Sequence, residues 1–378
     1  MPSVLDPRPS PFRRYLQHVD VLLLGATVTV SLIGVVMVYS ATRTKLASLG
    51  LDPHQYLKHQ ALFVVLGILA MLVCMAVDYH HFEELGLLAY GAVVFLLLAV
   101  MSPIGSRALG SQRWFQIGSF QLQPSAFAIL ALILAAASVI RRTEGALDGR
   151  ALVRLLVLGA VPVGLVVIQP DLGTAITLGC VLGTILVIAG VRGRYLAALA
   201  VLVVLAVLAG VHLGLLKHYQ VQRLTAFINQ NAASGQAGYN LKESKIAIGA
   251  GGLVGKGLFH GPQTNLQYVP EQQTDFIFTA VGEQLGFAGA ASLLALFGVI
   301  VWRVWRTAQL AYDTFGAMLC AGVLGYVAFS VFQNAGMTMG IMPITGIPLP
   351  LVSYGGSSTI ATFAAVGLVL SVGMRRFR

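Results

Sequence analysis

Two carboxylates, Asp275 and Glu283, lie where a polar segment gives way to a long apolar run starting at Phe276. An ionisable side chain at the mouth of a membrane helix is costly to keep there and by default indicates function. The spacing of eight residues is about two helical turns, so one helix would direct both side chains to one face and imply a wet cleft. Helix capping is the alternative for Asp275, and it is favoured for Asp171, which follows Pro170 before another apolar run.

Basic side chains on the same side of the chain suit an anionic ligand such as a lipid pyrophosphate. Arg223, Lys245 and Lys256 precede Asp275, and Arg113 belongs to a separate polar loop. Cations bind phosphate oxygens through strong, charge-assisted hydrogen bonds. For any single lysine, a solvated loop charge is the alternative interpretation.

Other catalytic patterns find little support. The run from Ala250 to Gly257 resembles a phosphate-binding loop but lacks its first glycine and its Ser/Thr. The eight histidines show no paired ligand spacing, and the three cysteines are isolated in apolar runs, which argues against a histidine-based metal site and against disulfides. Ser357 and Ser358 have no obvious histidine partner, so a serine hydrolase is not supported.

Membrane helices must position these residues. Of the 378 residues, 57% are hydrophobic and only 10% are charged, whereas globular chains are about one quarter charged. Ten apolar runs are long enough to cross a hydrocarbon layer of roughly 30 Å. They are 20–39, 60–77, 85–101, 126–140, 151–168, 172–191, 195–216, 276–301, 315–336 and 357–372. We expect an all-α integral membrane protein, a single polytopic domain of ten transmembrane helices over residues 1–378.

Arginines set the expected orientation, because short inner loops collect positive charge. A cytoplasmic tail of residues 1–18 places most arginine-rich short loops inside, together with the C-terminal residues 373–378. A large loop, 217–274, between spans seven and eight then faces outside. Within it, the glycine-rich run 246–259 is too short to span and is expected to form a re-entrant or surface-lying helix. The net charge of +10 reflects cations that meet membrane lipids, so nucleic acid is not an expected partner.

A second outer stretch, residues 334–358, is rich in proline and glycine, which predicts a rigid, non-helical connection. This stretch and several others resemble the SEDS family (shape, elongation, division and sporulation), the polytopic cell-wall polymerases. The motifs that carry the resemblance are QPDLGTA, KIAIGAGGLVGKG, PEQQTDFIF, GEQLGF and NAGMTMGIMPITGIPLPLVSYGGSS. Within the family, the GYN–KES–KIAIG run, NAGMTMG and the short termini resemble the elongation protein RodA more than the division protein FtsW.

The resemblance implies a ten-helix fold in the bacterial plasma membrane and a peptidoglycan glycosyltransferase that polymerises Lipid II at the outer face, during cell elongation and rod-shape maintenance. Asp275 occupies the position of the family's essential aspartate and would act as general base. The further substrate-binding candidates are Arg113, Arg223, Lys245, Lys256, Glu283, Ser353 and Ser357. Undecaprenyl pyrophosphate would leave, its charge stabilised by the four arginines and lysines of this set, together with any divalent cation (Mg²⁺ or Mn²⁺) held by Asp275 or Glu283. A class B penicillin-binding protein is the implied transpeptidase partner.

One stretch departs from the family pattern. The family usually continues QPSE with a lysine three residues after the glutamate, whereas Ala126 and Ile129 stand at these two positions here. Either substrate handling differs, or residues such as Arg113 or Lys256 take over. The alternatives to a polymerase are a precursor flippase, for which inverted repeats would be expected and none is seen, an ion-coupled transporter, and a non-catalytic scaffold for the penicillin-binding protein.

Overall fold

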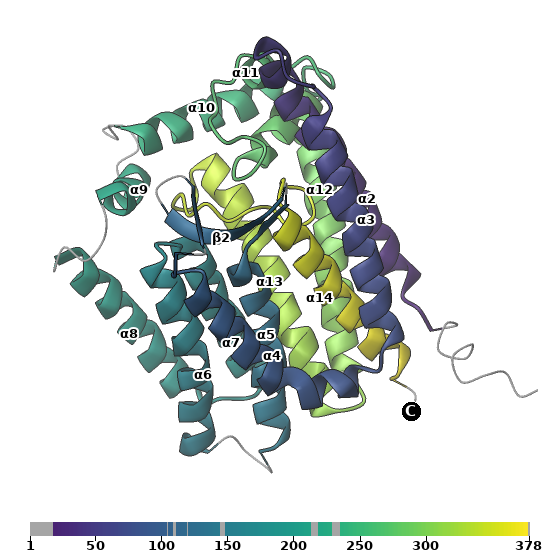
Figure 1. The fold of residues 1–378 in the computed structure, drawn as a ribbon, viewed down its shortest axis with the longest axis vertical. Coiled ribbons are helices and arrows are strands. Elements are labelled where there is room, and N and C mark those ends of the chain that lie inside the picture. The colour runs from purple at the N-terminus through teal and green to yellow at the C-terminus, as the bar shows by residue number, and fades with distance from the viewer. Residues whose placement is uncertain are drawn as a thin grey trace, which may run out of the picture.

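The protein is a bundle of long apolar helices with a small sheet and short helices at one end (Figure 1). This computed structural model describes residues 18–103, 105–108, 111–118, 120–143, 148–212, 218–228 and 235–376. Most of the predicted N-terminal tail and the last two residues of the predicted C-terminal one lie outside these ranges. The long helices are α2 (Val21–Ser48), α3 (Gln55–Ala76), α4 (Tyr79–Ala99), α5 (Pro124–Arg141), α6 (Gly149–Ile168), α7 (Leu172–Ile188), α8 (Gly193–His212), α12 (Ile277–Gln309), α13 (Thr314–Met339) and α14 (Gly356–Met374).

These helices agree with the predicted spans. Within the described residues, nine helices are long and apolar enough to cross a membrane, and α7 is a shorter apolar helix of 17 residues. Helices α5, α13 and α14 are mostly buried and form the centre of the bundle, whereas the apolar side chains of α8 from Val201 to Leu205 are exposed. Exposed leucines and valines on outer helices are expected where lipid replaces water.

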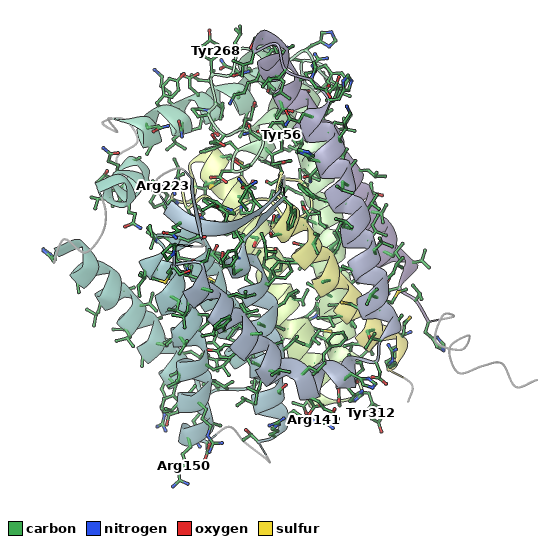
Figure 2. The ribbon with its side chains drawn as sticks, in the orientation of Figure 1. Tyr56, Arg141, Arg150, Arg223, Tyr268 and Tyr312 are labelled. Carbon is green, nitrogen blue, oxygen red and sulfur yellow. The ribbon has the colours of Figure 1, made fainter. Side chains whose placement is uncertain are left out.

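The two ends of the bundle differ. We call the end that carries the sheet, the short helices and the 341–355 loop the upper face, and the opposite end, where the C-terminus lies, the lower face (Figure 1). Arg141, Arg150 and Tyr312 lie at the lower face and Tyr56, Arg223 and Tyr268 at the upper one (Figure 2).

A network of charged residues joins the lower helix ends. The carboxylate of Asp313 caps α13 through the Gly316 amide at 2.9 Å and accepts from the hydroxyl of Tyr79 at 3.0 Å. It also pairs with Arg141 at 2.9 Å and with His80 at 3.1 Å. Because these partners come from α4 and α5, one carboxylate connects three helices. Buried charges are stable only when paired in this way.

The sheet and short helices form the upper face. Strands β1 (Ser106–Ala108), β2 (Ser111–Ile117) and β3 (Phe120–Leu122) make an antiparallel sheet in the order β1-β2-β3. Helices α9 (His218–Ile228), α10 (Gln236–Gly251) and α11 (Pro262–Asn265) lie within the predicted 217–274 loop. The helix predicted over 246–259 is wrong in both bounds, since α10 begins at Gln236 and ends at Gly251.

A break in α12 explains why α10 ends there. Gly286 has φ +66° and interrupts the helix, so carbonyls of the preceding turn lose their helical partners. The amides of Lys256 and Gly257 donate to the carbonyls of Glu283 and Gln284, both at 3.0 Å. The segment after α10 therefore pairs with the broken helix instead of continuing as a helix, as irregular backbone inside a membrane protein requires.

Candidate active site

Asp275 lies on the upper face in the turn that precedes α12. Its side chain is partly buried, and the helix begins only at Ile277, with Phe276 as its cap residue and no side-chain capping bond. The capping alternative for Asp275 is therefore wrong. The prediction that Asp275 and Glu283 share one helix is also wrong, because a turn separates Asp275 from the helix that carries Glu283.

Asn334 of α13 fastens the Asp275 turn to the 341–355 loop. Its side-chain amide donates to the backbone carbonyls of Asp275 and Ile347, each at 2.8 Å. Asn334 is fully buried, so these hydrogen bonds do not compete with water and hold the backbone firmly. Asn334 opens the motif from 334 to 358, but no local sequence pattern indicates this structural role.

The two serines predicted to bind substrate have structural partners instead. Ser353 donates to the carbonyl of Thr274 at 2.5 Å and accepts from the amide of Leu349 at 2.8 Å, which adds a second connection between the loop and the turn. Ser357 accepts from the amide of Gln123 at 2.9 Å and donates to a carbonyl of β3 at 3.2 Å. Both serines are buried, so they position the site's backbone.

The surroundings of Asp275 suit a proton acceptor near neutral pH. Burial raises the pKa of Asp275 to about 6, the Arg223 and Arg113 guanidinium groups oppose this rise, and the carboxylates of Glu271 and Asp171 add to it. Catalytic bases are commonly tuned toward neutrality by such a balance of burial and neighbouring charge. A group with this pKa is largely ionised at pH 7 yet retains appreciable affinity for a proton.

Gly346 brings the loop against both Asp275 and Arg223. The residue has φ +76°, and a Cβ atom there would lie 3.0 Å from Asp275 Oδ2 and 3.5 Å from Arg223 Nη1. Carboxylate and guanidinium therefore approach the same point from different elements, the α12 turn and α9. Only glycine combines this backbone conformation with the space that the two side chains need. No local sequence pattern distinguishes Gly346 from the other glycines of this loop.

We predict that Gly346→Ala lowers activity by about tenfold to a hundredfold, because the methyl group displaces the Asp275 carboxylate and small misplacements of a catalytic group cost this much. The control is Gly50→Ala, since Gly50 has φ +70° but no atom within 4 Å of an added Cβ. Both variants carry similar backbone strain of about 1 kcal/mol. Equal turnover in the two variants, measured after matching their thermal unfolding, would contradict a special role for Gly346.

Arg113 and Asp171 form a second charged group beside the site. Arg113 of β2 donates to the carbonyl of Gln169 at 2.9 Å and to that of Pro170, and lies 3.7 Å from the carboxylate of Asp171. Asp171 caps α7 by accepting from the amide of Thr174 at 3.2 Å, which confirms its predicted capping role. Arg113 thus anchors the sheet to the turn between α6 and α7 while its charge acts on Asp275.

The remaining predicted residues have other surroundings. Lys245 on α10 and Lys256 after it are exposed, and neither is among the charges that act most strongly on Asp275. Glu283 is fully buried, and its carboxylate accepts from the Gln263 amide at 2.7 Å and the Thr264 amide and hydroxyl at 3.0 and 2.6 Å. Because these bonds secure the start of α11, the predicted wet cleft shared by Glu283 and Asp275 is wrong.

A divalent cation finds no complete ligand set in this arrangement. No group of three or more histidine, cysteine, aspartate or glutamate side chains gathers anywhere in the described ranges. Two carboxylates were predicted to hold an ion. The Glu283 carboxylate accepts hydrogen bonds from α11, so only the Asp275 carboxylate remains available as a ligand. Magnesium sites in proteins usually combine one or two carboxylates with substrate phosphates, so a divalent cation would be held by Asp275 together with the pyrophosphate of the substrate.

Nearly the whole chain, including these site residues, matches one family. Residues 20–377 fit the FtsW, RodA and SpoVE model, described as a cell cycle protein. The chain belongs to the SEDS family. Among its SEDS relatives are the probable peptidoglycan glycosyltransferase FtsW of Geobacter metallireducens, 34% identical over 95% of this chain and 96% of the relative, and the peptidoglycan glycosyltransferase MrdB of Escherichia coli K12, 37% identical over 83% and 84%. Stage V sporulation protein E of Bacillus subtilis is 35% identical over 93% and 96%.

Solved SEDS structures share the fold. A chain from a peptidoglycan synthase complex, described as coordinating polymerization and crosslinking, aligns with TM-score 0.79 and 29% identity over 95% of this chain and 99% of that one. The rod shape determining protein RodA of Thermus thermophilus aligns with TM-score 0.70 and 29% identity over 95% and 98%. Relatives from the division, sporulation and elongation branches all match, so a specific resemblance of this SEDS protein to RodA is not supported.

Proposed function

We propose that this SEDS protein polymerises Lipid II into glycan strands, with Asp275 as the general base. The chain is a multi-pass membrane protein, and relatives that align over 95% and 83% of it are named probable peptidoglycan glycosyltransferase FtsW and peptidoglycan glycosyltransferase MrdB. The single observation that carries the residue assignment is the position of Asp275: it is partly buried on the upper face, its backbone is fixed by Asn334, and its carboxylate faces the same point as Arg223.

In the proposed reaction, Asp275 takes the proton of the acceptor sugar's 4-hydroxyl group. The oxygen then attacks the anomeric carbon of the donor as the bond from that carbon to the pyrophosphate breaks, so undecaprenyl pyrophosphate leaves with the electron pair. A single displacement inverts an α-linked donor to a β-linked product. The negative charge that develops on the pyrophosphate needs stabilisation by nearby cations. The candidates are the guanidinium groups of Arg223 and Arg113, because they are the cations that act most strongly on Asp275.

We further propose that the upper face is the outer one and that both termini are cytoplasmic. The lower face carries the arginines of short connections, including Arg141 and Arg150 (Figure 2), as expected for a cytoplasmic side. A class B penicillin-binding protein is the proposed partner, in line with the solved synthase complex that couples polymerization to crosslinking. Cell elongation is the proposed cellular role; complementation of an elongation-deficient strain, compared with a division-deficient one, tests it.

The activity of the enzyme should rise with pH across a midpoint near 6. Below that value Asp275, whose pKa burial raises to about 6, is protonated and cannot accept the hydroxyl proton. Above it the carboxylate is free to act, so the acid limb of kcat/KM against pH reports this group in the free enzyme. We expect roughly a tenfold loss from pH 7 to pH 5. A flat profile over this interval would contradict Asp275 as the base.

The decisive experiment for the function is synthesis of glycan from Lipid II by the purified full-length protein, with and without its penicillin-binding protein. Product that depends on the SEDS protein supports the polymerase. Transfer of Lipid II across a vesicle membrane without glycan formation would favour the flippase instead. Unchanged product after loss of Asp275, with the partner still bound, would favour a scaffold.

A further inference from the structure

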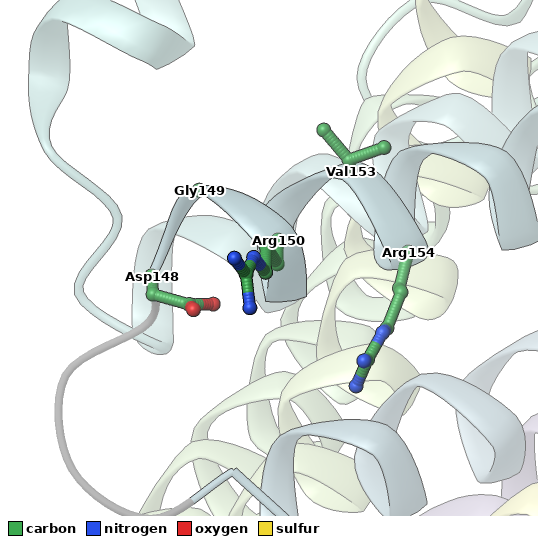
Figure 3. A pocket seen from close by; sticks show the side chains of 5 residues that line it. All are labelled: Asp148, Gly149, Arg150, Val153 and Arg154. Carbon is green, nitrogen blue, oxygen red and sulfur yellow. The ribbon is translucent and has the colours of Figure 1, made fainter.

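The lower end of α6 carries an open hollow (Figure 3), whereas Asp275 lies on the upper face. Its lining consists of Asp148, Gly149, Arg150, Val153 and Arg154. All five residues belong to the first turns of one helix or to its cap, at the lower face of the bundle (Figure 2). The Lipid II chemistry assigned to the upper face does not use this hollow.

Two arginines dominate the charge of the hollow. Arg150 and Arg154 are one helical turn apart and therefore neighbours on the helix surface. Both are exposed, and neither guanidinium has a hydrogen bond or ion pair with any described residue. The carboxylate of Asp148 is the opposing charge, and it accepts from the amide of Ala151 at 2.7 Å as the cap of α6. The described residues that line the hollow therefore carry a net positive charge.

A stripe of valines continues the same face of α6 toward the middle of the bundle. Val153, Val157 and Val161 follow at intervals of four residues, with exposed fractions of 58%, 57% and 40%. At about 100° of rotation per residue, these valines and the two arginines fall within one face roughly 100° wide. This face therefore has an arginine pair at the membrane border and an uncovered apolar strip leading into the hydrocarbon.

We propose that this face of α6 binds a phospholipid with a negatively charged headgroup from the leaflet at the lower face. The phosphate would accept hydrogen bonds from Arg150 and Arg154, while an acyl chain would lie along the valine stripe. Guanidinium groups match phosphate geometry well, and basic residues near an anionic leaflet favour lipid association. The occupant is a lipid rather than a free phosphate because the valines extend the site into the bilayer.

Native mass spectrometry of the full-length protein with added phosphatidylglycerol tests the proposal. The double variant Arg150→Gln/Arg154→Gln should retain phosphatidylglycerol roughly tenfold more weakly, while retention of zwitterionic phosphatidylcholine stays unchanged. The matched control is Arg192→Gln/Arg194→Gln, which removes the same charge at the beginning of α8, where Arg194 stacks on its neighbour Tyr195 at 4.8 Å.

Three outcomes are possible. Weaker retention of phosphatidylglycerol in the α6 double variant alone supports a specific lipid site. Equal loss in both double variants would mean that diffuse positive charge attracts the lipid, and this overturns a specific site. No loss in the α6 variant also overturns it. Because all four arginine side chains are exposed, thermal unfolding should be unchanged and can verify that every variant is folded.

Discussion

Asp275→Asn is expected to reduce glycan synthesis from Lipid II by on the order of a thousandfold, since asparagine keeps the shape of the side chain but cannot accept the hydroxyl proton. The fold should be unaffected, because the hydrogen bond from Asn334 reaches the backbone carbonyl of residue 275 and not its carboxylate. The measurement is the rate of glycan formation by the purified protein with its penicillin-binding protein, for variants with matched thermal unfolding.

Glu271→Gln provides the matched control. Glu271 lies in the same turn, is exposed, and also carries a negative charge that acts on Asp275. Its removal deletes one charge without touching the proposed base, so activity should stay within a few-fold of wild type. The pKa of Asp275 should fall, because a neighbouring carboxylate that raises it is gone. Comparable loss in both variants would indicate a general charge effect, and no loss in Asp275→Asn would exclude the base assignment.

The sequence predicted the spans well because hydrophobic length alone determines which segments can cross a bilayer. It also placed Asp275 correctly at a polar border. It failed to place Glu283, since nothing in the run after Phe276 shows that the helix begins at Ile277 and breaks at Gly286. The contacts that decide the role of Glu283 come from α11, about 20 residues earlier in the chain.

The missed residues share a physical cause. Asn334 and Gly346 matter because the 341–355 loop folds back on the Asp275 turn, and such a contact leaves no local periodicity in the sequence. Ser353 illustrates the opposite error, in which a polar residue within a family motif was expected to touch substrate. It is buried and bonded to Thr274 and Leu349. A polar residue in a proline-rich loop can thus serve the backbone as readily as a ligand.

Because Ala126 and Ile129 are apolar, other cations must bind the pyrophosphate, and the candidates near Asp275 are arginines. Both positions lie in the first turns of α5 and carry apolar side chains, where the resemblance predicted an acid and a lysine. Arg113 is committed to the turn between α6 and α7. Arg223 approaches the point that Asp275 also faces, beside Gly346. Among the predicted cations, Arg223 is therefore the one whose loss should affect the leaving pyrophosphate most.

Arg223→Gln is expected to lower kcat by about a hundredfold, because a positioned cation that stabilises the negative charge developing in the transition state typically contributes this much. A second, independent effect should accompany it. Arg223 holds the pKa of Asp275 down, so its removal should move the acid limb of the activity profile to higher pH. Rates of Lipid II polymerisation from pH 5 to pH 8 would measure both effects in one series.

Lys245→Gln is the control that separates a local role from general positive charge on the upper face. Lys245 was predicted as a pyrophosphate ligand, but its side chain is exposed on α10. Its loss should change kcat by less than a few-fold and leave the pH profile in place, since an exposed charge is screened by solvent and salt. If Lys245→Gln matched Arg223→Gln, the upper face would act as a diffuse electrostatic surface. If Arg223→Gln lost activity without a shift in the profile, Arg223 would contact substrate without tuning Asp275.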